Sequence, residues 1–160
     1  MWALLALDKA GRGDPAVETA RKRASTVLAG SKLTGKSTEW HVMRLLVDRG
    51  EGNEAERRTA ALLALQNEDG GWSWRTGDAS DALATGQALW GLSEAGLPHR
   101  HDAIRRAWSF LARTQDEDGA WPVRSTKASE QEEELPTSVF WGSAWAVIGI
   151  LETLPPPEEQ

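Results

Sequence analysis

One heptapeptide pattern occurs twice in the sequence, as QNEDGGW at residues 66–72 and as QDEDGAW at residues 115–121. Both copies have the same Gln-to-Trp spacing and the same acidic residues and glycine between. A tight turn needs only the glycine, which accepts backbone angles that other residues avoid. The conserved spacing of the two copies therefore indicates an internal structural repeat rather than two unrelated surface turns.

Helical periodicity surrounds both copies. Residues 100–114 place Ile104, Ala107 and Leu111 on one side, which is typical of a helix with one buried face. Segments such as 81–95 are apolar nearly all round, which is typical of a helix buried on several sides. The sequence predicts inner helices near 2–10, 37–49, 81–95 and 137–153, and outer helices near 15–29, 53–66 and 100–114. No segment alternates with a period of two, so the predicted class is all-α.

The predicted helices alternate between inner and outer, with glycine turns at Gly11, Gly50 and Gly96 inside the hairpins. Such helical hairpins must stack, because one hairpin cannot bury its own apolar face. Each heptapeptide follows an outer helix and precedes an inner one, so we call residues 66–72 the first clasp and residues 115–121 the second clasp. We expect the acids to favour the coming helix N-terminus and the Gln amide to pack on the Trp ring. The predicted clasp residues are Gln66, Gly71, Trp72, Gln115, Gly119 and Trp121.

Composition excludes several classes of protein. The mass of 17.5 kDa and the 40% hydrophobic content suffice for one domain with a core. A formal charge of −6 argues against nucleic acid as a partner. The apolar start, WALLAL, has neither the basic region of a signal peptide nor a helix cap, and no run is long enough to span a membrane. We therefore expect a soluble chain that starts inside a helix, as a piece of a longer protein.

The two clasps, each preceded by an apolar outer helix, resemble the QW repeats of the squalene-hopene and oxidosqualene cyclases. The resemblance covers about residues 40–151 and implies an α/α toroid, in which inner helices surround a cavity and outer helices surround the inner ones. Since a complete toroid of this type has more hairpins, the predicted seven helices form an incomplete ring. The expected domain is residues 1–153, followed by a loose, acidic, proline-rich tail at residues 154–160.

The chemistry that the resemblance implies lacks its central residues. Such cyclases protonate an alkene or epoxide with a DxDD acid, and the nearest match here is DASD, residues 78–81, in which Asp81 is expected to complement a helix N-terminus. The chain has no cysteine, so the zinc site of related prenyltransferases and the thioester of complement domains are both excluded. The remaining catalytic candidates are Asp81, Glu39 and His41. No cofactor and no metal site are predicted.

Inner helices also carry the candidates for contact with a ligand. These are the polar or aromatic residues Trp40, Arg44, Thr85, Gln87, Ser138, Trp141 and Trp145. Tryptophan faces attract carbocations, although the nine tryptophans can equally fill the space between helix layers. The polar groups can equally make structural hydrogen bonds or form a solvated face.

Three function classes remain open at this point. The first is a noncatalytic or partial module that offers an apolar or aromatic cavity to an isoprenoid ligand, or a surface to a protein. The second is a catalytic fragment of a terpene cyclase, and the third is a polysaccharide-acting α/α barrel that would use Glu39, Arg44 and Asp81. The flanks of an incomplete ring, with Leu4, Leu5 and Leu7 at one end and Phe140, Val147 and Leu151 at the other, predict a homodimer or contact with the rest of a longer chain.

Overall fold

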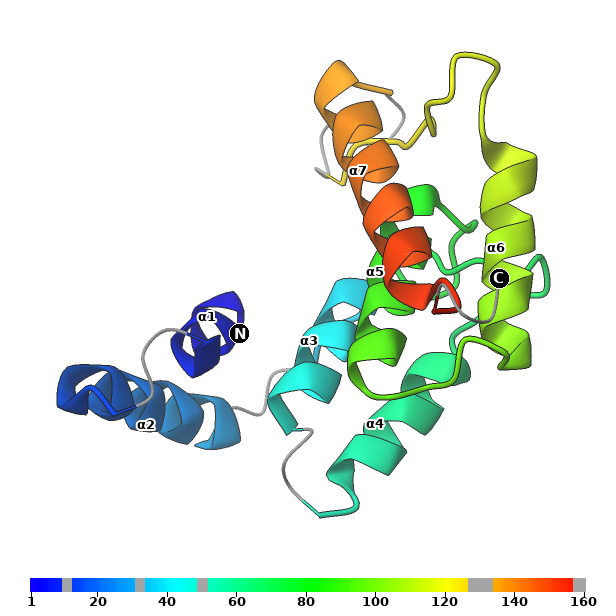
Figure 1. The fold of residues 1–160 in the computed structure, drawn as a ribbon. Helices are drawn as coiled ribbons and strands as arrows, with labels where there is room; N and C mark the ends of the chain where they lie inside the picture. The colour runs from blue at the N-terminus through cyan, green and yellow to red at the C-terminus, as the bar shows by residue number, and fades with distance from the viewer. Residues whose placement is uncertain (10–12, 31–33, 49–51, 127–133, 157–160) are drawn as a thin grey trace.

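The computed structural model describes residues 1–9, 13–30, 34–48, 52–126 and 134–156. Regular structure in these ranges is helical, apart from two isolated bridges, Ser37–Arg75 and Trp72–Asp81. The helices are α1 (Trp2–Lys9), α2 (Pro15–Gly30), α3 (Thr38–Asp48), α4 (Glu54–Leu63), α5 (Ala82–Glu94), α6 (Asp102–Thr114) and α7 (Pro136–Thr153) (Figure 1). Every predicted helix is present, and each end lies within three residues of its prediction. The predicted turns at Gly11 and Gly50, and residues 157–160 of the predicted tail, lie outside the described residues.

The helices form two layers, as the alternating pattern predicts. The inner helices α1, α3, α5 and α7 each pack against the next inner helix, while α2, α4 and α6 pack outside them. Contact between α5 and α7 is the most extensive, because glycines bring their backbones together. A Cβ atom at Gly86 would collide with the carbonyl of Trp145, and one at Gly149 would lie 2.6 Å from the carbonyl oxygen of Gly86.

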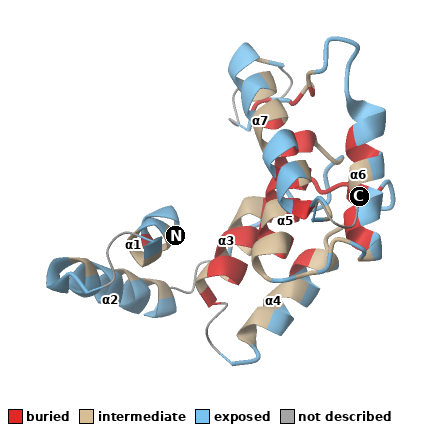
Figure 2. Cartoon of the chain, in the orientation of Figure 1, coloured by how far each residue is buried: buried red, intermediate tan, exposed pale blue. Residues whose placement is uncertain are grey.

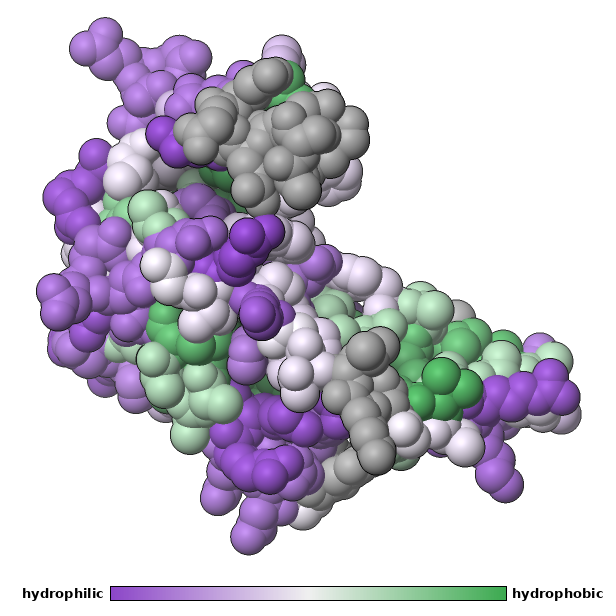
Figure 3. Space-filling model, turned by 180° about the vertical axis from the view of Figure 1, so that it is seen from behind, coloured by the Kyte–Doolittle hydropathy of each residue, from purple (hydrophilic) through white to green (hydrophobic). Residues whose placement is uncertain are grey.

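The core lies between α3 and α5 and the facing sides of α4 and α6 (Figure 2). Helix α5 is buried along nearly its whole length, whereas α6 buries a single stripe that includes Ile104, Ala107 and Leu111. Helix α2 buries no residue. Seen from behind, the outline of the molecule is notched between the projecting α1–α2 hairpin and the part that carries α7 (Figure 3).

The two clasps repeat the same set of hydrogen bonds. The indole nitrogen of Trp72 donates to the carbonyl of Leu62 at 2.8 Å, and that of Trp121 donates to the carbonyl of Leu111 at 2.9 Å. Both acceptors lie in the last turn of an outer helix, where carbonyls lack an i+4 backbone donor; the carbonyl of Leu62 also accepts from the N–H of Leu65 at 3.2 Å. Each clasp therefore donates a hydrogen bond to a carbonyl at the end of the outer helix that precedes it.

The glutamines close the same turns through their amides. The Nε2 atom of Gln66 donates to the carbonyl of Gly70 at 2.8 Å, and that of Gln115 donates to the carbonyl of Gly119 at 2.9 Å. Gly70 and Gly119 have φ angles of +93° and +85°, a conformation that side chains with a Cβ rarely adopt. The glutamine thus holds the glycine that reverses the chain by hydrogen bonding to its carbonyl.

Each clasp is also joined to the inner helix that follows it. The backbone N–H of Trp72 donates to Thr85 Oγ1 at 2.9 Å, and that of Trp121 donates to Ser143 Oγ at 3.0 Å. The acids play a different part from the one expected, because Asp69 accepts from the N–H of Gly71 inside the turn. Asp118 accepts from Ala120 in the same way.

The two ends of the inner row differ in exposure. On α7, Phe140, Val147 and Leu151 are 65%, 46% and 62% exposed, as the prediction of an open flank requires. At the other end the prediction is wrong, because Leu4 is buried and Leu5 and Leu7 are half-buried where α1 packs against α2 and α3. Within the part of the chain that the structure describes, no helix has the length and apolar character needed to cross a membrane.

Candidate functional site

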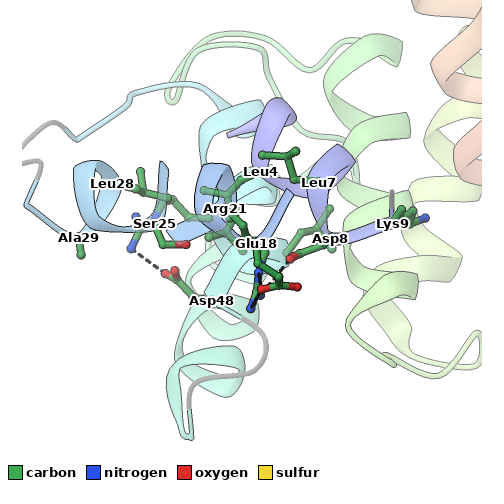
Figure 4. A pocket seen from close by; sticks show the side chains of 13 residues that line it. Leu4, Leu7, Asp8, Lys9, Glu18, Arg21, Ser25, Leu28, Ala29 and Asp48 are labelled. Carbon is green, nitrogen blue, oxygen red and sulfur yellow. Dashed lines mark hydrogen bonds and ion pairs between the residues drawn. The ribbon is translucent and has the colours of Figure 1, made fainter. Parts of the chain in front are cut away.

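One cavity, about 1060 Å³, lies between α1, α2 and α3 (Figure 4). Its arginines form ion pairs with acidic residues that also line it. Arg21 contacts Asp8 at 3.2 Å, and Arg44 contacts Asp48 at 2.8 Å. Paired charges favour a structural role for this cavity rather than contact with an apolar ligand.

A second cavity, about 700 Å³, lies near the N-terminal ends of the inner helices. Its lining residues come from both sides of the notch, and all four inner helices contribute. They are Trp2, Glu39, Leu83, Gln87, Leu135, Thr137, Ser138, Trp141 and Trp145, with Trp74 and residues 123–126 from the connecting segments. The described lining residues thus include four tryptophans and one carboxylate, that of Glu39. This cavity is the candidate site.

A tryptophan cluster supports one wall of the candidate site. The rings of Trp2 and Trp90 stack at 5.8 Å with an interplanar angle of 11°. Trp145 lies 6.1 Å from Trp2 and 5.5 Å from Trp90. Trp2 also donates its indole N–H to Glu39 Oε1 at 2.9 Å. Three inner helices, α1, α5 and α7, are therefore joined by aromatic contacts beside the cavity.

Gln87 places a buried polar group in this aromatic wall. Its side chain is 3% exposed, and its Oε1 atom has no hydrogen-bond partner among the described residues. A buried acceptor without a partner costs about 1–3 kcal/mol. A donor on a bound molecule would remove this cost, so Gln87 is a candidate polar anchor of the site.

Four predicted ligand contacts, Gln87, Ser138, Trp141 and Trp145, line this cavity, whereas three others do not. Thr85 accepts from Trp72 in the first clasp. Arg44 contacts Asp48, which is 4% exposed and also accepts from Arg58 Nε at 3.0 Å. The ring of Trp40 contacts His41 edge-on at 5.0 Å, and its side chain covers Gly35. An inner helix also has sides that face neighbouring helices. A residue on an inner helix therefore does not necessarily line the cavity.

The candidate acids occupy different environments. Asp81 caps α5, where its Oδ1 accepts from the N–H of Ala84 at 2.7 Å and its Oδ2 accepts from the N–H of Trp74 at 2.6 Å. Burial raises the pKa of Asp81 to about 6. Burial, followed by the charge of Arg58, lowers the pKa of His41. Of the three catalytic candidates, only Glu39 lines the cavity.

The sequence interpretation missed Trp2 and Trp74 as lining residues. Trp2 carries a signal that could have identified it, because it begins a predicted inner helix and the cavity lies near the first turns of those helices. Trp74 carries no such signal. It belongs to the segment after the first clasp, and its position depends on the bond between its N–H and Asp81.

Residues 33–154 match the family model for the squalene-hopene cyclase C-terminal domain. The chain belongs to this family. The family has the α/α toroid fold, and the hairpins described above form an incomplete ring of it. The resemblance indicated by the two clasps is thereby confirmed.

Several curated proteins share sequence with this chain. A squalene–hopene cyclase of Zymomonas mobilis is 37% identical over 92 residues, which is 56% of this chain and 14% of that protein. A drimenyl diphosphate synthase of Streptantibioticus cattleyicolor is 37% identical over 83 residues, which is 51% of this chain and 15% of that protein. A second drimenyl diphosphate synthase, from Streptomyces showdoensis, is 32% identical over 80 residues, which is 50% of this chain and 15% of that protein. These matches thus cover only 14% to 15% of the length of the relatives.

Proposed function

We propose that this chain is a partial module of terpene-cyclase type, which binds an isoprenoid ligand without supplying the acid that starts cyclisation. The observation that carries the proposal is the cavity of about 700 Å³ lined by Trp2, Trp74, Trp141 and Trp145. Its volume falls within the roughly 300–1,000 Å³ of ordinary small-molecule sites. Indole faces bind apolar chains and also attract cations.

The names of the relatives support an isoprenoid ligand over a polysaccharide, since they are a squalene–hopene cyclase and drimenyl diphosphate synthases. Polysaccharide sites of the alternative type would place carboxylates and arginine together on the inner rim. Here Arg44 and Asp81 are used in an ion pair and a helix cap, and neither lines the aromatic cavity. The aromatic wall, with Gln87 as its polar anchor, suits an isoprenoid chain that carries one hydrogen-bond donor.

Two carboxylates, Asp81 and Glu39, support the noncatalytic reading. Both oxygens of Asp81 accept backbone hydrogen bonds as the cap of α5, and Asp81 is not among the residues that line the cavity. Glu39 Oε1 is held by the indole of Trp2. No other carboxylate belongs to the described lining residues. The module therefore serves to bind and orient.

Binding of two prenyl probes of equal length tests the proposal. Tryptophan fluorescence should report binding of both farnesol and a farnesyl dimethylammonium salt, with the cation roughly 2- to 13-fold tighter, because cation–π attraction contributes about 0.5–1.5 kcal/mol. Trp141→Ala should weaken both. Trp108→Phe is the matched control, because Trp108 bonds to Thr153 and does not line the cavity. Absence of binding, or equal losses in the two variants, would overturn the proposal.

The catalytic alternative draws on one observation, the raised pKa of Asp81. A buried carboxyl with a raised pKa is a common feature of general acids. The purified chain incubated with squalene should nevertheless give no cyclised product above a control without protein. A product that disappears in Asp81→Asn would replace our proposal with the catalytic one.

A further inference from the structure

The α1–α2 hairpin projects from the rest of the molecule and buries little of its own surface (Figure 1). Helix α2 buries no residue, and α1 buries only Leu4. The cavity of about 1060 Å³ lies between this hairpin and α3. Asp8 of α1 and Arg21 of α2 form an ion pair at 3.2 Å, which joins the two helices to each other. A unit that buries little apolar surface has low local stability, so the hairpin can separate from the core without unfolding it.

Trp2 attaches this hairpin to two other inner helices. Its ring stacks on Trp90 of α5, with the ring centroids 5.8 Å apart and an interplanar angle of 11°. Its indole N–H donates to Glu39 Oε1 of α3 at 2.9 Å. Trp2 is nevertheless 46% exposed. The attachment therefore depends on one ring contact and one hydrogen bond at the surface rather than on burial in the core.

Trp90 supports the candidate site from outside the cavity. Trp2 and Trp145 line the cavity, whereas Trp90 is not among the lining residues. The ring of Trp90 lies 5.8 Å from that of Trp2 and 5.5 Å from that of Trp145. A change at Trp90 therefore reaches a ligand in the cavity through the rings that Trp90 holds in place.

We propose, on the basis of the isoprenoid site proposed above, that the α1–α2 hairpin is a lid on the aromatic cavity and that Trp90 is the positioning residue that keeps it closed. Trp2 forms part of the cavity wall only while α1 is docked on α3 and α5. A ligand that contacts Trp2 binds this docked state more tightly and shifts the population toward it. By the same linkage, any change that favours docking of the hairpin raises the affinity for the ligand.

Distances between two spin labels test the lid directly. The sequence has no cysteine, so nitroxide labels on Val27→Cys of α2 and Glu56→Cys of α4 are the only ones attached, and both positions are exposed. Pulsed electron paramagnetic resonance then gives the distribution of distances between the hairpin and the rest of the molecule. We expect farnesol to narrow this distribution. Trp2→Ala should broaden it without ligand, whereas the control Trp108→Phe should leave it unchanged.

The results separate a failure of the lid from a failure of the site. Farnesol binding seen by fluorescence, with a distance distribution that neither farnesol nor Trp2→Ala changes, overturns the lid and leaves the proposed function standing. Absence of farnesol binding overturns the proposed function and the lid together.

Two variants of Trp90 test its positioning role. Trp90→Leu removes the ring on which Trp2 stacks, whereas Trp90→Phe keeps an aromatic ring there. We expect Trp90→Leu to broaden the distance distribution and to weaken farnesol binding by roughly 2- to 13-fold, with Trp90→Phe close to the unmodified chain in both. A merely structural role would lower the melting temperature without broadening the distribution. Loss of affinity without broadening, or equal affinities of the two variants, overturns the positioning role.

Discussion

Replacement of Trp72 by alanine should be the most destabilising change at either clasp. The side chain is 0% exposed, and its indole N–H satisfies the carbonyl of Leu62 at the end of α4. Removal of a buried tryptophan costs about 3–5 kcal/mol. This loss is a large share of the roughly 5–15 kcal/mol that stabilises a typical domain. For a chain of this size we expect the melting temperature to fall by about 10 °C or more.

Urea unfolding followed by far-ultraviolet circular dichroism measures this change without relying on tryptophan fluorescence. Trp72→Phe separates the two contributions, because it keeps an aromatic ring and removes the indole donor, while the carbonyl of Leu62 keeps the N–H of Leu65 at 3.2 Å. We expect a loss of about 0.5–1.5 kcal/mol for that variant from the hydrogen bond alone. Trp141→Ala is the control, since Trp141 is 52% exposed and should cost less than about 1 kcal/mol. Equal losses in Trp72→Ala and Trp141→Ala would refute the clasp account.

Three other changes test the contacts that surround the site. Gly86→Ala should cost about 1–3 kcal/mol or more, because a Cβ would collide with the backbone of α7, whereas Gly30→Ala, with open space around it, should be nearly neutral in thermal unfolding. Asp48→Ala should cost about 3–5 kcal/mol in urea unfolding, since it leaves two arginines near a buried site without their shared partner. Burial raises the pKa of Asp81 from 3.8 to about 6, so the folded state binds this proton more tightly than the unfolded state. Relative to Asp81→Asn, the unmodified chain should therefore gain stability as the pH falls from about 7 to about 4, by at most about 3 kcal/mol, and a constant difference across urea titrations would contradict this.

The fold could be predicted because its signals are local and repeated. The one-sided pattern of residues 102–114 and the all-round apolar pattern of residues 82–94 reflect the number of neighbours that each helix has. The Gln-to-Trp spacing fixes where a turn follows an outer helix. The exposure of Phe140 could be predicted from the position of α7 at the end of the inner row, whereas burial of Leu4 depends on contacts of α1 with both α2 and α3.

The site could be predicted only in part, because the face of an inner helix is set by contacts between distant segments. Trp141 and Trp145 line the cavity as their place on α7 indicates. Thr85 lies on an inner helix too, but it faces the first clasp. The stacking of Trp2 on Trp90 joins α1 to α5 across most of the chain, and no local pattern encodes it.

Photochemical labelling tests the central claim most directly, namely that the aromatic cavity at the N-terminal ends of the inner helices binds an isoprenoid chain. The full chain is irradiated with a farnesyl diazirine probe, and the labelled residues are identified by mass spectrometry. Our account predicts labels on α7 near Trp141 and Trp145 and on α5 near Leu83, which excess unlabelled farnesol suppresses. Labels confined to the charged cavity near Leu7 and Leu28, or spread over the exposed Phe140, Val147 and Leu151 without suppression, would contradict it.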